Sequence, residues 1–336
     1  MSVVVPTYDG AETLRTTIEA LNRQTVPDGS YEIIVVDDAS TDDSALVAEA
    51  AGARVIRQPA NRGAGAARNA GVRAARAPLV AFIDDDCTAE PGWLAELIEP
   101  LSDPAVDGAG GQIVPHADDG LVSRYIAARN PWKPLSAELL ESASPAYRLR
   151  LYLRGLLETE AGDEEAGCDL FAVAGANMAF RTEVLNGLGG FDETYRVSEE
   201  TELCRRLHSR PGRSRIVYRP SAKVHHRFHP SLRGILRRAR WYGEGNARFA
   251  AEHEDVRLIV FPFPVLLAAA FLAALLTRRR GLAAAVPFLP PLAYVGWLKR
   301  ALSRRELEPL AYPYLQMAQE LATMAGEASV ALRGRR

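Results

Sequence analysis

The sequence predicts an α/β protein whose central sheet is mostly parallel, doubly wound and flanked by helices, followed by an apolar helical hairpin. Two observations predict the sheet. Short apolar runs alternate with segments of helical periodicity along the first 83 residues. Two of these runs end in consecutive carboxylates, and the carboxyl ends of the strands are where such sheets bind ligands. The hairpin is predicted by two long apolar stretches that lie between arginine clusters.

The predicted sheet is built from strands and helices in alternation. Strand Ser2–Val5 is followed by a turn and by a helix with Leu14, Ile18 and Leu21 at helical spacing. The next predicted elements are strand 31–36, helix 44–51 with capping residues at 40–44, strand 54–56, a helix opened by residues 61–69, strand 79–83 and a helix beginning at 90–94.

The second half of this region is less regular. Its predicted elements are strand 106–114, strand 171–181 with a glycine turn, helix 199–207 with acids in its first turn, strand 215–218 and a basic, aromatic helix at 233–249. Residues 115–167 contain several prolines and the acidic run 158–165, which indicates a variable and partly mobile segment. We expect an α/β domain at 1–250 with halves 1–114 and 115–250, a hairpin at 251–305, and an amphipathic, basic tail at 306–336.

The composition is that of an ordinary globular protein, and it disfavours some partners. The 336 residues are enough for one large domain or two modest ones. The net charge is -2, so there is no general electrostatic attraction to nucleic acid. Cys87, Cys168 and Cys204 lie far apart without the spacing of a metal site, which indicates free thiols in a reducing compartment. No signal peptide precedes the first strand, so we expect this domain to stay in the cytosol.

Two apolar stretches predict a membrane-associated hairpin. Residues 258–276 are almost wholly apolar and about long enough to cross a bilayer as a helix. Residues 282–298 are also apolar but contain three prolines. A spanning hairpin would place the arginines of 278–280 outside, against the positive-inside rule, whereas a re-entrant or interfacial hairpin keeps the basic residues on the cytosolic side. A buried core helix is the alternative in a soluble protein.

The triplet Asp84-Asp85-Asp86 directly follows strand 79–83. Packed carboxylates repel each other and resist ionising together. A divalent cation that also bridges phosphate oxygens would remove the repulsion, and a solvated acidic turn is the alternative. Along an extended chain Asp84 and Asp86 point the same way. Asp85 points elsewhere, so we expect it to be the least essential of the three.

Several short motifs, taken in order, resemble the signatures of glycosyltransferase family 2. The motifs are Val5–Gly10, Val36–Asp42, Asn61–Gly63 with Ala67–Asn69, Asp84–Asp86, Gly190–Glu193, Glu199-Glu200 and His226. Each alone is weak evidence, but the ordered set over residues 2–250 is specific. The resemblance implies an inverting enzyme with the GT-A fold, which has a Rossmann-like central sheet, of the membrane-associated bacterial type.

The resemblance implies a nucleotide-sugar site at the first motifs. The turn of Pro6, Thr7 and Tyr8 would border the nucleotide. Asp38 or its neighbour Asp37 would accept a hydrogen bond from the base, as a carboxylate at a strand end can.

The family also implies a metal centre and its surroundings. Asp86 would bind Mg²⁺ or Mn²⁺ bridging the diphosphate, and Asp84 would contact the ribose or a metal-bound water, with Asp85 beside them. His226 resembles the family's late histidine near the diphosphate or metal, and packing is its alternative role. Arg68 resembles the arginine near the nucleotide pocket, and a helix-surface arginine is the alternative.

An inverting transfer needs a base that takes the proton of the acceptor hydroxyl. The family usually has Glu-Asp here, with the Asp as base, whereas this chain has Glu199-Glu200. Glu200 matches the position, but its longer side chain leaves Glu199 as a rival, and both could simply occupy the first turn of a helix. Gly175 and Asn177 resemble the acceptor-side turn.

The resemblance and the hairpin together lead to one functional hypothesis. The chain would be a metal-dependent inverting glycosyltransferase that moves a sugar from a nucleotide-diphosphate donor to a hydroxyl acceptor, such as a lipid-linked or cell-envelope glycan in polysaccharide biosynthesis. We expect membrane lipid as a partner, and the cell membrane as its location with the catalytic domain in the cytoplasm.

Two alternatives belong to other classes. A nucleotidyltransferase normally has a glycine-rich, lysine-bearing signature after the first strand, where this chain has Pro6–Gly10. A non-catalytic nucleotide-sugar-binding membrane protein would bind the donor without turnover.

Overall fold

The computed structural model divides the chain into two compact units, which are described separately. Unit 1 comprises Met1–His116, Pro131–Glu141 and Gly162–Phe228, and unit 2 comprises Ala117–Asn130, Ser142–Ala161 and His229–Arg336. The structure describes residues 1–27, 29–116, 120–129, 135–136, 145–157, 167–212, 214–227, 231–253 and 261–333. The acidic run 158–165, predicted to be mobile, lies outside the described residues.

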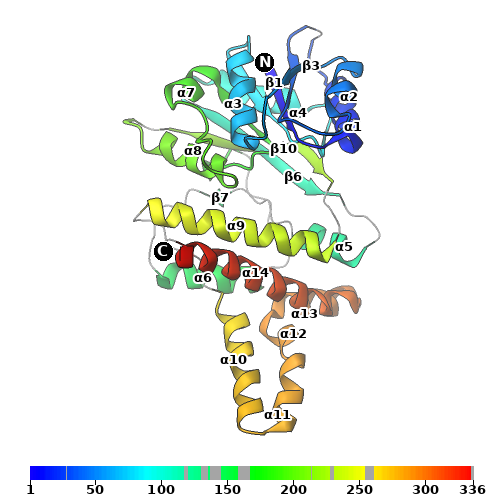
Figure 1. Ribbon diagram of the computed structural model, residues 1–336, viewed down its shortest axis with the longest axis vertical. Coiled ribbons are helices and arrows are strands. Elements are labelled where there is room, and N and C mark those ends of the chain that lie inside the picture. The colour runs from blue at the N-terminus through cyan, green and yellow to red at the C-terminus, as the bar shows by residue number, and fades with distance from the viewer. Residues whose placement is uncertain are drawn as a thin grey trace. The chain divides into compact units, whose positions relative to one another are not determined.

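Unit 1 is built around a mixed sheet, with eight strands among the described residues in the order β3-β2-β1-β4-β9-β6-β10-β5 (Figure 1). These strands are β1 (Ser2–Thr7), β2 (Glu32–Asp37), β3 (Arg54–Arg57), β4 (Leu79–Phe82), β5 (Cys87–Ala89), β6 (Gly108–Pro115), β9 (Met178–Arg181) and β10 (Ile216–His226). A separate pair is formed by β7 (Leu135–Ser136) and β8 (Leu170–Ala172).

The direction of the strands corrects one part of the prediction. Strands β3, β2, β1 and β4 are parallel neighbours, which confirms the predicted alternation in the first half of unit 1. Strands β6 and β10 are parallel as well, but β9 and β5 run antiparallel to their neighbours. The sheet is therefore mixed, with four parallel and three antiparallel pairings among its described strands, so the predicted parallel order holds for most of the sheet but not for β9 and β5. Hydrophobic periodicity shows which side chains are buried but not the direction in which a strand runs.

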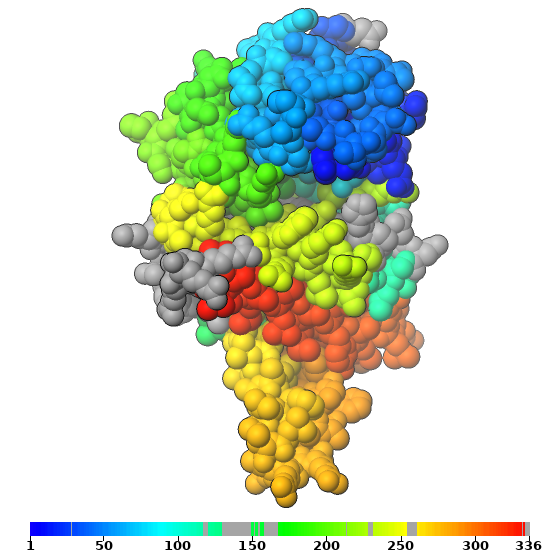
Figure 2. All heavy atoms as spheres, viewed as in Figure 1, coloured from blue at the N-terminus to red at the C-terminus, as the bar shows by residue number. Residues whose placement is uncertain are grey.

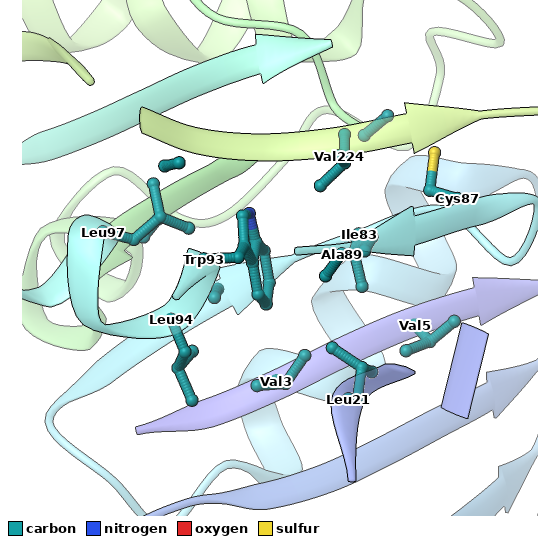
Figure 3. Packing of buried hydrophobic residues seen from close by; sticks show 14 of the residues in the cluster. Val3, Val5, Leu21, Ile83, Cys87, Ala89, Trp93, Leu94, Leu97 and Val224 are labelled. Atoms are coloured by element: carbon teal, nitrogen blue, oxygen red, sulfur yellow. The ribbon is translucent and has the colours of Figure 1, made fainter. Parts of the chain in front are cut away.

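Helices cover both faces of this sheet. They are α1 (Ala11–Leu21), α2 (Ser44–Ala50), α3 (Ala64–Ala74), α4 (Trp93–Ile98), α7 (Thr182–Gly187) and α8 (Glu199–His208), and a 3₁₀ turn, η1 (Pro100–Ser102), follows α4. Side chains alternate along β1, so Val3 and Val5 pack on one face with Leu21 and Trp93 (Figure 3). Val4 packs on the opposite face, in the cluster that includes side chains of α3 and α8. These two cores fix the strand ends against the helices that begin there.

Unit 2 is helical in its described part. Its helices are α5 (Leu121–Arg129), α6 (Pro145–Leu157), α9 (Leu232–Glu252), α10 (Pro262–Leu276), α11 (Arg280–Ala285), α12 (Pro290–Ala293), α13 (Val295–Arg304) and α14 (Tyr312–Arg333), with 3₁₀ turns η3 (Val286–Phe288) and η4 (Glu308–Leu310). Helix α9 begins at Ser231, whose hydroxyl accepts from the Gly234 N–H at 3.0 Å. Helix α14, formed by the predicted amphipathic tail, packs along α9 (Figure 1).

The predicted membrane hairpin takes a different form. Helix α10 and the segment from α11 to α12 do form a helical hairpin, which projects from unit 2 and contacts α14 through α10 and α12 (Figures 1 and 2). However, α10 has 15 residues, which give a length of about 22 Å against a hydrocarbon core of about 30 Å. Among the described residues, no helix is long and apolar enough to cross a membrane. Residues 258–260 of the predicted span lie outside the described part.

The second apolar stretch is not one helix, which corrects the prediction for residues 282–298. Pro287 and the pair Pro290-Pro291 divide it into α11, η3, α12 and α13, because proline cannot continue a helix from the preceding turn. The alternative of a buried core helix is also wrong for α10, in which only Pro264 and Ala274 are buried among the described residues. Its large apolar side chains are exposed, at Val265, Leu266, Phe271, Leu272, Leu275 and Leu276.

Candidate active site

The carboxyl ends of β1, β2 and β4 meet at one edge of the sheet, and acidic side chains gather there. Thr7 at the end of β1 is in register with Asp37 at the end of β2. The triplet 84–86 begins two residues after β4, the other parallel neighbour of β1. Parallel neighbours bring their carboxyl ends to the same edge, so the two acid-tipped strands of the sequence contribute to one site.

Asp85 turns away from the other two acids of the triplet, as predicted. Its carboxylate accepts from the Thr7 hydroxyl at 2.5 Å, and its backbone carbonyl accepts from the Thr17 hydroxyl at 2.8 Å. Burial, opposed by the hydrogen bond from Thr7 and aided by the negative charges of Asp86 and Asp84, raises the pKa of Asp85 to about 7. Asp85 therefore ties the end of β4 to the turn after β1, a positioning role that the alternation of side chains does not reveal.

Asp86 lies beside His226, at the end of β10. The distance from Asp86 Oδ1 to His226 Nε2 is 3.4 Å, and that from Asp86 Oδ1 to Cys87 Sγ is 3.7 Å. One potential ligand atom from each of the three lies within 4.8 Å of the others. Strand β5 explains the meeting, because it pairs antiparallel with β10 and sets Cys87 opposite His226. Burial and the three neighbouring aspartates raise the pKa of the Cys87 thiol, so the thiol keeps its proton and donates to Asp86.

This donor set fits a divalent cation. A carboxylate oxygen suits Mg²⁺ and Mn²⁺, and an imidazole nitrogen is a common ligand of first-row divalent metals. Asp86 and His226 are therefore the residues of this chain that would hold the metal. Asp84, predicted to contact the ribose or a metal-bound water, has one carboxylate oxygen bound by the Arg68 guanidinium at 2.9 Å.

Arg68 lies in the interior and not on a helix surface, which excludes the alternative weighed for it. Its side chain on α3 is buried, with the residue 3% exposed. Nη2 donates to Asp84, and Nη1 donates to Glu199 Oε1 at 2.5 Å. The guanidinium carbon lies 5.9 Å from the centre of the Phe191 ring. Arg68 thus connects the end of β4 with the first turn of α8.

Glu199 and Glu200 begin α8 and differ in their surroundings. Glu199 is buried and ion-paired with Arg68. Burial raises the pKa of Glu200, the negative charge of Glu199 raises it further, and the positive charge of Arg68 opposes them. The preceding residue, Ser198, has a left-handed backbone with φ 65°, which turns the chain sharply into the helix. Glu200 is thus a carboxyl that holds a proton more tightly than usual.

Asp37 and Asp38 are occupied by the loops around them. Asp37 Oδ1 accepts from the Ser40 N–H at 2.8 Å. The carboxylate of Asp38 accepts from the backbone N–H groups of Arg62 and Gly63, at 2.9 and 2.7 Å. Asp38 therefore holds the loop that leads into α3, and its Oδ1 also accepts from Gln58 at 3.1 Å.

The turn after β1 presents one side chain to solvent. Pro6 and Thr7 are buried, whereas Tyr8 is 49% exposed at the edge of the site. The next residue, Asp9, has a left-handed backbone with φ 52°, and its carboxylate accepts from the Thr41 N–H at 2.7 Å. The turns after β1 and β2 are thereby fixed to each other.

The two residues predicted on the acceptor side both contact other parts of the protein. Asn177 is 1% exposed, and its amide donates to two backbone carbonyls and accepts from Trp93 Nε1 at 2.8 Å. We therefore assign Asn177 to the core. Gly175 faces Arg68, because a Cβ atom at this position would lie 2.5 Å from Arg68 Nη2. The glycine permits a close approach, as expected, but the approaching group is the arginine.

Comparisons with known proteins place this geometry in a family. The model of glycosyl transferase family 2 matches residues 2–188, more than half of the chain. The chain belongs to glycosyltransferase family 2. A second model, glycosyl transferase family group 2, matches residues 162–299. The family predicted from the ordered motifs is thus confirmed.

Family 2 relatives of this chain act in different settings. The pre-mycofactocin glycosyltransferase of Mycobacterium tuberculosis is 29% identical over 262 residues, and the match covers 76% of this chain and 48% of that protein. The chain therefore spans about half the length of that relative. The glucosyl-dolichyl phosphate glucuronosyltransferase of Haloferax volcanii is 24% identical over 260 residues, which cover 72% of this chain and 75% of that protein.

A solved structure shows the fold. The mannosyltransferase PcManGT from Pyrobaculum calidifontis, in complex with GDP-Man and Mn²⁺, aligns with a TM-score of 0.57 at 19% identity. The alignment covers 97% of this chain and 86% of that chain. The family 2 chain thus has a GT-A-like α/β fold, as the motifs implied.

The structure adds residues to the site that the sequence reasoning did not assign. Thr17 and Cys87 contact the acid triplet, and Asn69 contacts the backbone of Phe191. Asn69 and Phe191 belong to two of the family 2 motifs, so their positions carried a signal. Thr17 carried none, because a threonine at a buried helix position is ordinary.

Proposed function

We propose that this family 2 chain is a divalent-metal-dependent, inverting glycosyltransferase that moves a sugar from a nucleoside diphosphate donor to a hydroxyl acceptor. One observation carries the proposal. Arg68 joins Asp84, which follows β4, to Glu199 in the first turn of α8, where Glu200 also lies. Asp84 is two residues before Asp86, which lies beside His226 of β10. This arrangement supports a donor site and a proton acceptor that lie close together at one edge of the sheet.

The donor side has groups of the right chemistry. Asp86 and His226 would hold Mg²⁺ or Mn²⁺, and such a cation supplies charge neutralisation for the leaving diphosphate. The PcManGT structure, which contains GDP-Man and Mn²⁺, supports a metal and a nucleotide-sugar donor for this chain. The exposed ring of Tyr8 borders the turn between β1 and α1, where the resemblance places the nucleotide.

Glu200 is the base in this proposal. The Glu199 carboxylate is held by Arg68, whereas the pKa of Glu200 is raised by burial and by Glu199. A carboxylate of raised pKa accepts a proton more readily near neutral pH than an ordinary one. Glu200 would take the acceptor hydroxyl proton on a carboxylate oxygen as the hydroxyl oxygen attacks the anomeric carbon. The diphosphate leaves from the opposite face, which inverts the configuration.

For the acceptor we propose a lipid-linked or cell-envelope glycan. The Haloferax relative is described as acting on glucosyl-dolichyl phosphate, a lipid-linked sugar. The apolar hairpin of α10 to α12 gives unit 2 an exposed apolar surface that suits a lipid partner. The mycobacterial relative has a different acceptor by its description, so the acceptor class is open to direct test.

For the location we propose the cytoplasmic face of the cell membrane, with the hairpin in the interface. Exposed leucines and phenylalanines would bury in the headgroup region, and the arginines of 278–280 would meet anionic headgroups. The test is flotation with vesicles of phosphatidylcholine, with and without phosphatidylglycerol. The double change Leu272→Asp and Leu276→Asp should abolish binding. Leu46→Asp on α2 is the control, because Leu46 is 58% exposed and Leu272 56%.

The activity is tested with a panel of nucleotide sugars, with Mn²⁺, with Mg²⁺ and with chelator. We expect turnover of at least one donor that stops in chelator and in Asp86→Ala. Asp43→Ala is the control, since Asp43 is exposed and makes no capping hydrogen bond. Calorimetry with the same donors separates an enzyme from a binding protein, which would bind without turnover. Full activity of Asp86→Ala would contradict the metal role.

A further inference from the structure

The Arg68 cluster, defined here as Arg68 with Asp84, Glu199 and Glu200, joins three separate elements of unit 1. Arg68 comes from α3, Asp84 follows β4, and the glutamates begin α8. Both terminal nitrogens of the guanidinium are used, one for Asp84 and one for Glu199. A planar fork that bridges two carboxylates fixes their relative position more tightly than a lysine could, since lysine offers one point charge.

The residue next to Arg68 strengthens this connection. Asn69 Nδ2 donates to the Phe191 carbonyl at 2.8 Å, and the Phe191 N–H donates to Asn69 Oδ1 at 2.8 Å. Gly190, with φ 77°, makes room for this contact, because a Cβ atom there would lie 2.4 Å from Asn69 Oδ1. Two consecutive residues of α3 therefore hold the segment that leads into α8 and the first turn of α8 itself.

The turn that contains Gly175 also packs against the guanidinium of Arg68. Gly175, in the turn between β8 and β9, leaves no room for a side chain above Arg68 Nη2. The guanidinium also faces the Phe191 ring. Arg68 is thus enclosed by a turn, a ring and two carboxylates, so it cannot move far without losing one of these contacts.

We propose that Arg68 is a positioning residue that acts through Glu199 to set the place and the charge of the base Glu200. This inference rests on the function proposed above. By pairing with Glu199, Arg68 removes that carboxylate from competition for the proton. The same pair holds the first turn of α8 at a fixed distance from Asp84, on the side where the donor would bind.

If Arg68 sets the charge of Glu200, the pKa of Glu200 depends on Arg68 and Glu199 in opposite ways, which a purely structural ion pair would not require. The charged groups facing Glu200 are Glu199 on α8, Arg68 on α3 and Asp84 after β4. Glu199→Gln removes the negative neighbour and so lowers the pKa of Glu200. Arg68→Gln removes the positive neighbour and raises it. The two variants should therefore shift the Glu200 titration in opposite directions.

The experiment follows Glu200 by carbon NMR of side-chain carboxyl-labelled glutamate, with kcat and KM measured in parallel. Glu200→Gln identifies the signal of Glu200 in the spectrum. We expect that signal to titrate above the usual carboxyl range in the unaltered protein, at lower pH in Glu199→Gln and at higher pH in Arg68→Gln. Equal titration in all three proteins would overturn the inference.

Kinetics then separate positioning from binding. Gly175→Ala and Arg68→Lys should lower kcat at least tenfold while the affinity for a nucleoside diphosphate with Mn²⁺ stays within threefold, the range that about 0.65 kcal/mol covers. Gly187→Ala is the control, because a Cβ atom there meets nothing within 4 Å. A kcat of Gly175→Ala equal to that of the original chain would also overturn the inference. So would turnover by Glu200→Gln under conditions in which Glu199→Gln shows none. Failure of the proposed function looks different, since no donor would turn over while the opposite NMR shifts remained.

Discussion

Units 1 and 2 each contain buried acids, but the two groups of acids are neutralised in different ways. In unit 2, Glu320 on α14 is 2% exposed and accepts three hydrogen bonds from uncharged donors. Tyr294 Oη donates to it at 2.7 Å, Tyr152 Oη at 3.0 Å and Gln316 Nε2 at 2.9 Å. In the Arg68 cluster of unit 1, three carboxylates share one guanidinium.

This difference indicates a packing role for the acid of unit 2 and a chemical role for the acids of unit 1. Every oxygen of Glu320 has a donor, so the Glu320 cluster, which we define as Glu320 with Tyr152, Tyr294 and Gln316, is a satisfied network that fixes the packing of α6, α12, α14 and the start of α13. The Arg68 cluster has more negative charge than its cation balances. Such an excess costs stability in a resting protein, and it is useful where a proton or a cation is taken up during a reaction.

Glu200→Gln should give the largest effect on turnover. The amide has the shape of the carboxyl but cannot take a proton, so kcat should fall by roughly 10²- to 10⁴-fold, the contribution of a general base. Steady-state kinetics with the donor found in the panel measure this. Glu320→Gln is the matched control, because it makes the same change in a buried acid of unit 2, and its turnover should be unchanged. Similar losses in both variants would remove the distinction between the clusters.

Glu320→Leu should give the largest effect on stability. The change leaves two tyrosine hydroxyls and the Gln316 amide without their acceptor, which costs about 3 kcal/mol. Urea unfolding followed by tryptophan fluorescence, to which the buried Trp297 of unit 2 contributes, measures the loss. Glu200→Gln should not lower stability in the same assay. An unfolding midpoint of Glu320→Leu equal to that of the original chain would show that the network is dispensable.

Stability should fall as pH rises above 5, because Glu200 in the Arg68 cluster has a raised pKa in the folded state. The pKa of Glu200 is raised from 4.5 to about 8, chiefly by burial, so between these values the unfolded chain releases a proton that the folded chain keeps. The folded state then binds more protons, and stability falls as pH rises through this window. Thermal unfolding from pH 5 to pH 8 should show a smaller decline for Glu200→Gln than for the original chain. An identical decline in both would assign the pH dependence to other groups.

Much of unit 1 follows from local sequence. The alternation of apolar runs with helical segments predicted β1, β2 and β4 as parallel strands, two of them followed by acids, and the structure brings their carboxyl ends together. The antiparallel strand β5 could not be predicted, because Cys87–Ala89 is too short to show a period. Its pairing with β10 is what sets Cys87 and Asp86 beside His226.

The contacts of single side chains were harder to predict than the elements. The resemblance implied ligand contacts for Asp38, Gly175 and Asn177, and the structure adds contacts with a loop, with Arg68 and with Trp93 that the sequence did not predict. A buried polar residue reads the same in a sequence whether its partner is a ligand or the protein's own backbone. In unit 2, the tyrosines around Glu320 come from segments more than a hundred residues apart, and no local pattern connects them.

Tyr294→Phe should give the smallest effect, because it removes a single hydrogen bond from the Glu320 cluster. The ring stays in place, since Tyr294 is fully buried, but one of the two hydroxyl donors to Glu320 Oε2 is lost. We expect a loss of about 1 kcal/mol in urea unfolding and no change in kcat. Tyr314→Phe is the control, because its hydroxyl donates to the Pro287 carbonyl at an exposed position and should contribute little. Because Tyr152 remains a donor, the loss should be smaller than that of Glu320→Leu. An equal loss would mean that Tyr294 alone stabilises Glu320, as Arg68 alone does for the acids of unit 1, and the two clusters would then not differ.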